Sequence, residues 1–122
     1  MNQTAFRTKR ADFGSADIRT DRDIEYAVFT KATFSLRRAE MTSKSSDRVE
    51  GLTLNNALWT TITADLAHEG NKLPQELRAT LLSLGLYSIR YSQKSMQNSD
   101  SLQPLIDINQ RMMKGLRGDV SP

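Results

Sequence analysis

The stretch PQELRATLLSLGLYSIRYSQKSM, residues 74–96, decides the fold. Pro74 can open a helix because its missing N–H needs no partner in the first turn, and Glu76 suits the positive end of the helix dipole. At 100° per residue, large apolar side chains occupy most of the circumference. A helix of this kind must be covered on several sides, which predicts a helical bundle. These side chains are Leu77, Leu81, Leu82, Leu84, Leu86, Tyr87, Ile89 and Tyr91.

The preceding segment predicts a second helix with a broad apolar arc. It begins between Asp47 and Thr53, and Gly70-Asn71 supplies its stop. We expect Trp59 to be a core anchor. Gly85 in the following helix costs about 1 kcal/mol relative to alanine, so its expected use is to let another helix approach closely. The arc comprises Leu52, Leu54, Leu58, Trp59, Ile62 and Leu66.

Downstream, residues 99–115 predict the most clearly amphipathic helix of the chain. Ser99 or Asp100 can cap it, and Pro104 falls within its first turn. Asn109 lies in the middle of the apolar face, where a buried amide needs hydrogen-bond partners. We favour a structural Asn109 whose amide is hydrogen-bonded to a neighbouring backbone, and the alternative is an Asn109 that contacts a partner protein. The apolar face contains Leu102, Leu105, Ile106, Met112, Met113 and Leu116.

The first predicted helix runs from about Thr20 to Met41 and carries two apolar lines. The main stripe has the spacing of one helical face, and a second line of Ala27, Phe34 and Met41 repeats every seven residues. The favoured interpretation is a helix sandwiched between two neighbours, and the alternative is an exposed docking stripe. The main stripe is Ile24, Val28, Ala32, Leu36 and Ala39.

Together these segments predict an all-α fold, a small antiparallel bundle of about four helices. Residues 1–19 are expected to form a loose or partly helical N-terminal segment, residues 20–116 the helical domain, and residues 117–122 a disordered tail. We find no sustained alternation of apolar and polar residues that would indicate a strand.

Composition excludes several classes of function. The 17 basic and 14 acidic side chains are dispersed along the chain rather than gathered in a basic arm, so we expect no direct nucleic-acid binding. There is no cysteine, and His68 is the single histidine, which we interpret as a structural residue at a helix end. Glycine-rich phosphate loops and metal-ligand spacings are missing from the sequence. We therefore expect a protein that is not an enzyme and uses no cofactor or metal.

Hydropathy argues against export and membrane insertion. The first twenty residues have no apolar signal region, and the longest apolar run, residues 81–91, is interrupted by serine, glycine and arginine. We expect a cytoplasmic protein.

Five segments occur in a characteristic order and spacing: RDIEY (22–26), LNNALWTT (54–61), GNKLP (70–74), SLG (83–85) and LIDINQRMMKGL (105–116). Together they resemble the FlaF family of flagellar biosynthesis regulators. The likeness covers residues 20–116 and implies a protein needed for flagellin production and export, acting with the regulator FlbT as a flagellin secretion chaperone. Two departures are Leu54, where an aromatic residue is expected, and Asn56-Ala57, where an arginine is expected.

The resemblance fits a surface that binds a partner's helix, because amphipathic helices dock in apolar grooves. We expect a terminal helix of flagellin to contact the excess apolar surface of the last two helices together with the Phe34 and Met41 line. The competing hypothesis is a homodimer that buries the same surface. The alternative function is post-transcriptional regulation of flagellin mRNA. The candidate binding residues are Phe34, Met41, Tyr87, Tyr91, Leu105, Asn109, Met112 and Met113.

Overall fold

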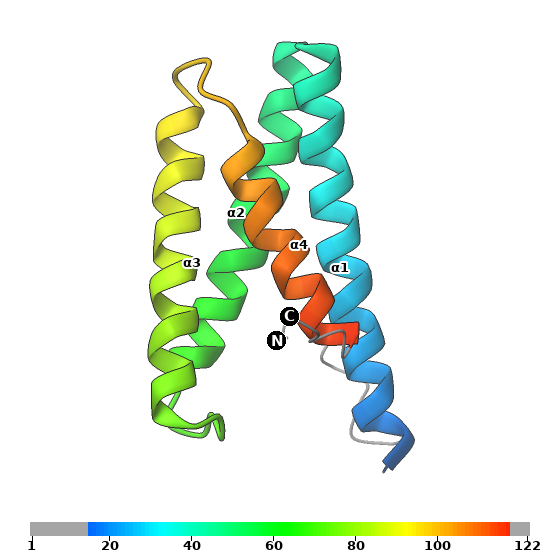
Figure 1. The fold of residues 1–122 in the computed structure, drawn as a ribbon, viewed down its shortest axis with the longest axis vertical. Helices are drawn as coiled ribbons and strands as arrows, with labels where there is room; N and C mark the ends of the chain where they lie inside the picture. The colour runs from blue at the N-terminus through cyan, green and yellow to red at the C-terminus, as the bar shows by residue number, and fades with distance from the viewer. Residues whose placement is uncertain (1–14, 118–122) are drawn as a thin grey trace.

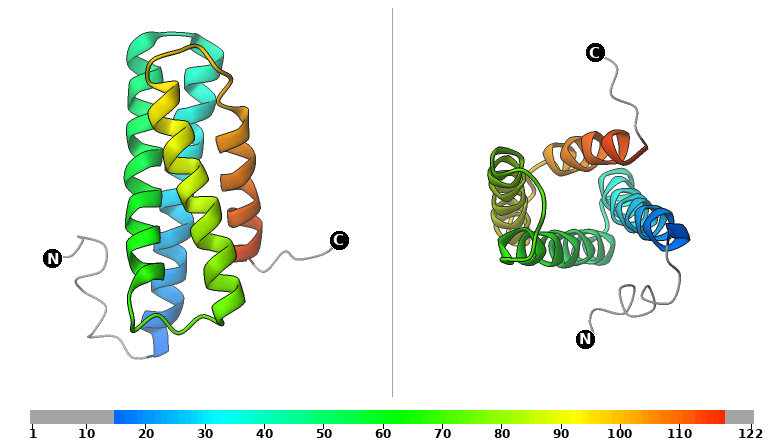
Figure 2. Two further views of the ribbon diagram at one scale, coloured as in Figure 1. Left: turned by 90° about the vertical axis from the view of Figure 1, so that its left-hand side faces the viewer. Right: turned by 90° about the horizontal axis from the view of Figure 1, so that it is seen from below.

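The protein is a bundle of four antiparallel helices, as the sequence predicts. The computed structural model describes residues 15–117, and it describes the side-chain surroundings of residues 26–115. The chain runs up, down, up and down through the bundle (Figure 1), and the end-on view shows the tilted helices along the four sides of a square, with α1 opposite α3 (Figure 2). The helices are α1 (Ser15–Thr42), α2 (Ser45–Ala67), α3 (Gln75–Ser95) and α4 (Gln103–Arg117).

Residues 15–19, expected to be loose or partly helical, belong to α1, and Arg117 ends α4. The predictions of a loose N-terminal segment and a disordered tail also concern residues 1–14 and 118–122, which lie outside the described residues. Helix α2 begins at Ser45 rather than after Asp47 and ends at Ala67, before the predicted Gly70-Asn71 stop. These differences arise at helix ends, where caps and local geometry decide the last turn.

Short links define the ends of the helices. Ser43 has a φ of 58°, the left-handed conformation that ends helices, and it leaves only a two-residue link between α1 and α2. His68 follows the last residue of α2, and its Nδ1 accepts a hydrogen bond of 2.9 Å from the Gly70 N–H, in keeping with a structural role. At the start of α4 the Leu102 carbonyl accepts the first helical hydrogen bonds, so the N-cap position is Leu102 and not the predicted Ser99 or Asp100. The Ser101 Oγ accepts a 3.1 Å hydrogen bond from the N–H of Gln103, the first residue of the helix.

The buried core consists of two apolar clusters stacked along the bundle. The first lies toward the α1–α2 link and includes Leu36, Leu52 and Leu105. The second surrounds Trp59, which is fully buried as predicted and meets the ring of Phe29 edge to face at a centroid distance of 5.8 Å. Edge-to-face contact of this kind is a favoured aromatic geometry.

Helix α3 is covered less than its sequence predicts. Its buried residues are small, namely Gly85, Ser88, Ser92 and Ser95, and they face the bundle. A Cβ on Gly85 would lie 2.3 Å from Thr63 Cγ2, which confirms that the glycine permits a close approach to α2. Because the small residues occupy the interface, the larger apolar side chains lie on the flanks, and Leu77, Leu86 and Tyr87 remain 44–46% exposed.

The second apolar line of α1 faces solvent. Helix α1 packs against α2 and α4, which lie on its other sides. Ala27 is exposed, and Phe34 and Met41 are 66% and 84% exposed. The favoured prediction that this helix lies between two neighbours is therefore confirmed, but neither neighbour covers the Ala27, Phe34 and Met41 line, which is exposed as the alternative predicted.

Candidate functional site

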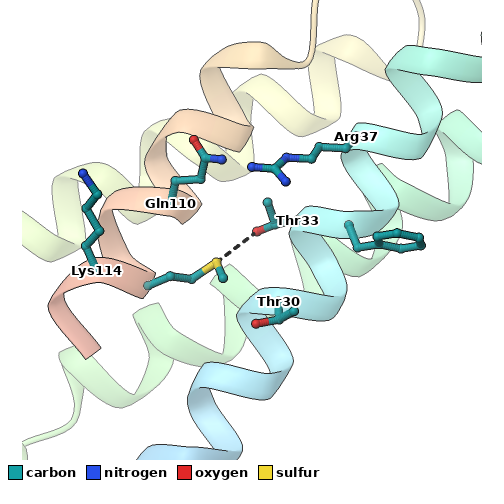
Figure 3. Close-up of a pocket in the computed structure, with 7 residues that line it drawn as sticks. Thr30, Thr33, Arg37, Gln110 and Lys114 are labelled. Atoms are coloured by element: carbon teal, nitrogen blue, oxygen red, sulfur yellow. Dashed lines mark hydrogen bonds between the residues drawn. The ribbon is translucent and has the colours of Figure 1, made fainter. Parts of the chain in front are cut away.

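A groove runs between α1 and α4. It has a volume of about 390 Å³, within the range of roughly 300–1,000 Å³ that ligand sites occupy, and it opens to solvent. Seven side chains from the two helices line it, and Figure 3 shows Thr33 and Arg37 extending from α1 toward α4. They are Thr30, Thr33, Phe34 and Arg37 from α1 and Gln110, Met113 and Lys114 from α4.

Helical periodicity places these residues on one face of each helix. The α1 residues follow the spacing i, i+3, i+4, i+7, and the α4 residues follow i, i+3, i+4. The base of the groove is closed where Thr33, which is buried, directs its Oγ1 toward the Met113 sulfur at 3.8 Å (Figure 3). This contact joins residues 80 positions apart in the sequence.

The lining combines apolar and cationic groups. Phe34 and Met113 supply apolar surface, while Arg37 and Lys114 supply two positive charges from opposite helices. Neither cation forms a salt bridge within the described residues, and no carboxylate is among the lining side chains. The groove therefore offers apolar contact beside unneutralised positive charge.

Phe34 and Met113 are the two predicted binding residues that line this groove. Met41 lies two turns beyond Phe34 on the exposed line. Met112 and Met113 are both half-buried and pack against the cluster around Trp59.

Tyr87 and Tyr91 form a second patch, on α3. Their ring centroids lie 5.8 Å apart, and the Lys94 ammonium is 5.9 Å from the Tyr91 centroid. The Tyr91 hydroxyl donates a 2.6 Å hydrogen bond to the Ser101 carbonyl. Burial, followed by the nearby negative charge of Asp100, raises the pKa of Tyr91 above its ordinary value of 10.0. This patch belongs to the helix opposite α1 (Figure 2).

Two predicted binding residues are fully buried, which corrects the expectation that they lie on a docking surface. Leu105 belongs to the first core cluster. Asn109 is the centre of a buried polar network. Its Oδ1 accepts a hydrogen bond of 2.9 Å from the Trp59 Nε1–H, and its Nδ2 donates a hydrogen bond of 2.8 Å to Asn55 Oδ1. Asn55 in turn donates to the hydroxyls of Ser88 and Ser92 on α3. The structural role favoured for Asn109 is confirmed, but its partners are the side chains of Trp59 and Asn55 and not a neighbouring backbone.

The groove also contains Arg37, Gln110 and Lys114, which are not among the binding residues predicted from the sequence. A usable signal was present, because Arg37 is one turn from Phe34 on the same face of α1. The pairing of that face with α4 could not be read from spacing within one helix.

The described part of the chain contains neither a candidate metal site nor a candidate membrane span. No group of three or more His, Cys, Asp or Glu side chains there could hold a metal ion. None of its helices has the length and hydropathy needed to cross a bilayer.

Comparison with known proteins gives one match. A family model described as "Flagellar protein FlaF" matches residues 11–116 of the 122-residue chain. No curated protein and no solved structure matches this chain.

Proposed function

The chain belongs to the FlaF family of flagellar proteins, and from this premise we propose that it binds flagellin and supports flagellin synthesis and secretion as an export chaperone. FlaF is not a known family of enzymes. The proposal assigns the protein a role in holding an unassembled flagellar subunit before export, acting together with FlbT.

The exposed apolar line on α1 carries the proposal. Phe34 and Met41 are large side chains that the monomer's own core does not use, since both are more than half exposed. Burying a side chain of this kind against a partner contributes roughly 1.5–3 kcal/mol. An export chaperone needs such surface to cover the apolar face of a partner's helix until assembly.

Helix α3 supports a second contact. Leu77, Leu86 and Tyr87 are about half exposed on a helix that stands across the bundle from α1 (Figure 2). Two separate apolar surfaces are consistent with two protein partners, and we assign the second to FlbT.

The proposal can be tested by titrating the purified full-length chain with monomeric flagellin from the same organism. We expect Phe34→Asp to weaken binding by about tenfold or more, because it places a charge in an apolar contact. Val49→Asp is the matched control, since Val49 is an exposed apolar residue of α2 outside the α1 line, and its variant should bind like the wild type.

Circular dichroism must show that both variants keep the helical fold. If the wild type does not bind flagellin, the chaperone role is wrong. If it instead binds the flagellin mRNA with an affinity that falls steeply with salt, the post-transcriptional alternative is correct.

A further inference from the structure

We infer that the α1–α4 groove receives an amphipathic helical segment of flagellin that carries a carboxylate beside its apolar side chains. The inference rests on the proposed function and assigns to it one surface and one kind of bound segment. The partner's apolar side chain packs against Phe34 and Met113, and its carboxylate lies between Arg37 and Lys114.

The shape of the groove fits a helix face. Its two walls are themselves helices, and its lining residues repeat at one-turn intervals along both (Figure 3). An amphipathic helix presents its anchors at the same spacing, which is why grooves between helices suit helical partners. Phe34 contributes to the lining of the groove, is 66% exposed, and is one of the aromatic residues that are enriched at the buried centres of protein interfaces.

The charge of the groove selects the segment. Arg37 and Lys114 make no salt bridge within the described residues, and the remaining lining side chains are neutral. Two cations on facing walls create a positive potential, and a groove with apolar sides screens it less than open solvent does. An acidic partner gains attraction and faster association, whereas a basic partner is repelled.

The same charges disfavour two other occupants. A second copy docked with its two-fold axis through the groove would bring Arg37 and Lys114 against their own equivalents. Residues 1–14 of this chain carry three basic side chains and one acidic side chain, so their net charge has the same sign as the groove. A separate acidic segment is the occupant that the electrostatics favour.

The test compares binding of monomeric flagellin to the full-length chain and its variants by calorimetry at about 50 mM and about 300 mM salt. We expect the double variant Arg37→Glu/Lys114→Glu to lose about tenfold or more in affinity at low salt, and Phe34→Ser to lose a similar factor at both salt concentrations. The wild-type affinity should fall with salt.

The matched control is Arg90→Glu/Lys72→Glu, which makes the same charge change at exposed positions of α3 and of the α2–α3 link. This control should bind within about twofold of the wild type. Circular dichroism and thermal unfolding of each variant separate loss of binding from loss of fold.

Amide shifts of the isotopically labelled chain locate the contact directly. We expect flagellin to perturb residues 30–37 and 110–114, and perturbation confined to α3 would overturn the inference. Full affinity of the Arg37→Glu/Lys114→Glu variant would also overturn it while leaving the proposed function intact.

If the wild type does not bind flagellin, the proposed function and this inference fall together. If the wild type is a dimer and the double charge variant is a monomer, the groove is occupied by a second copy and the inference is wrong.

Discussion

Substitution of Asn109 by leucine removes the centre of the buried polar network that joins α2, α3 and α4. In the wild type, the Asn109 side chain accepts a hydrogen bond from Trp59 and donates one to Asn55, at 2.9 Å and 2.8 Å. Leucine has a similar size but neither a donor nor an acceptor. The Trp59 indole N–H and the Asn55 carbonyl oxygen would then be buried without these partners, since both side chains are fully buried.

The expected cost follows from these two groups. Each buried donor or acceptor left without a partner costs roughly 1–3 kcal/mol, which gives roughly 2–6 kcal/mol for the pair. Burial of the apolar leucine offsets roughly 1.5–3 kcal/mol of this loss. We therefore expect Asn109→Leu to lower the free energy of unfolding by about 2 kcal/mol, a sizeable part of the roughly 5–15 kcal/mol that stabilises a typical domain.

Urea unfolding measures this change. Trp59 is the single tryptophan of the chain and is fully buried, so its fluorescence reports the core, and circular dichroism at 222 nm reports the helices. Gln93→Leu is the control, because Gln93 is exposed on α3 and its substitution should change stability by about 0.5 kcal/mol or less. An Asn109→Leu variant as stable as the wild type would refute the reasoning. The double variant with Trp59→Phe should show coupling of about 1 kcal/mol, because the two residues share one hydrogen bond.

Three further outcomes follow from packing and titration. Gly51→Ala should lower the free energy of unfolding by about 1–2 kcal/mol in urea titrations, because the new Cβ would lie 3.1 Å from the Ser35 carbonyl oxygen and 3.3 Å from Leu36 Cα, both backbone atoms. Gly115→Ala should instead stabilise the protein by about 0.5–1 kcal/mol, since nothing lies within 4 Å of its added Cβ and alanine favours the helix. Tyr91 should ionise above pH 10 in absorbance titrations at 295 nm. Because its folded pKa is raised, stability should fall as pH rises past 10 through that pKa, and Tyr91→Phe should remove this dependence.

Local signals in the sequence were sufficient to predict the helices. The Pro74–Glu76 start of α3 and the burial of Trp59 were correct because capping and strong apolar character act within a few residues. Helix ends were less accurate. Ser43 ends α1 through a left-handed backbone conformation, and the Ser101 hydroxyl accepts a hydrogen bond from the first residue of α4. Serine has many other uses in loops, so neither role could be read from the residue type.

The interior face of α3 could not be predicted from hydropathy. Its leucines and tyrosines outnumber its serines, yet Ser88 and Ser92 are buried and Tyr87 is half exposed. Gly85 and the serines let α2 approach closely, and Asn55 provides the hydrogen bonds that make buried hydroxyls acceptable. A periodic pattern identifies apolar side chains, but the distance between two helix axes decides which of them are covered.

The candidate site likewise has one part that the sequence predicted and another part that only the tertiary structure determines. The exposed line of Phe34 and Met41 was visible as a seven-residue repeat, and its exposure was one of two interpretations that spacing alone left open. The groove depends on the contact between Thr33 and Met113, 80 residues apart, and on the two cations that this contact places on facing walls. Periodicity within a helix arises from neighbouring residues, so it can be read directly from the sequence. The pairing of one helix with another arises from packing of the whole bundle, so only the tertiary structure determines it.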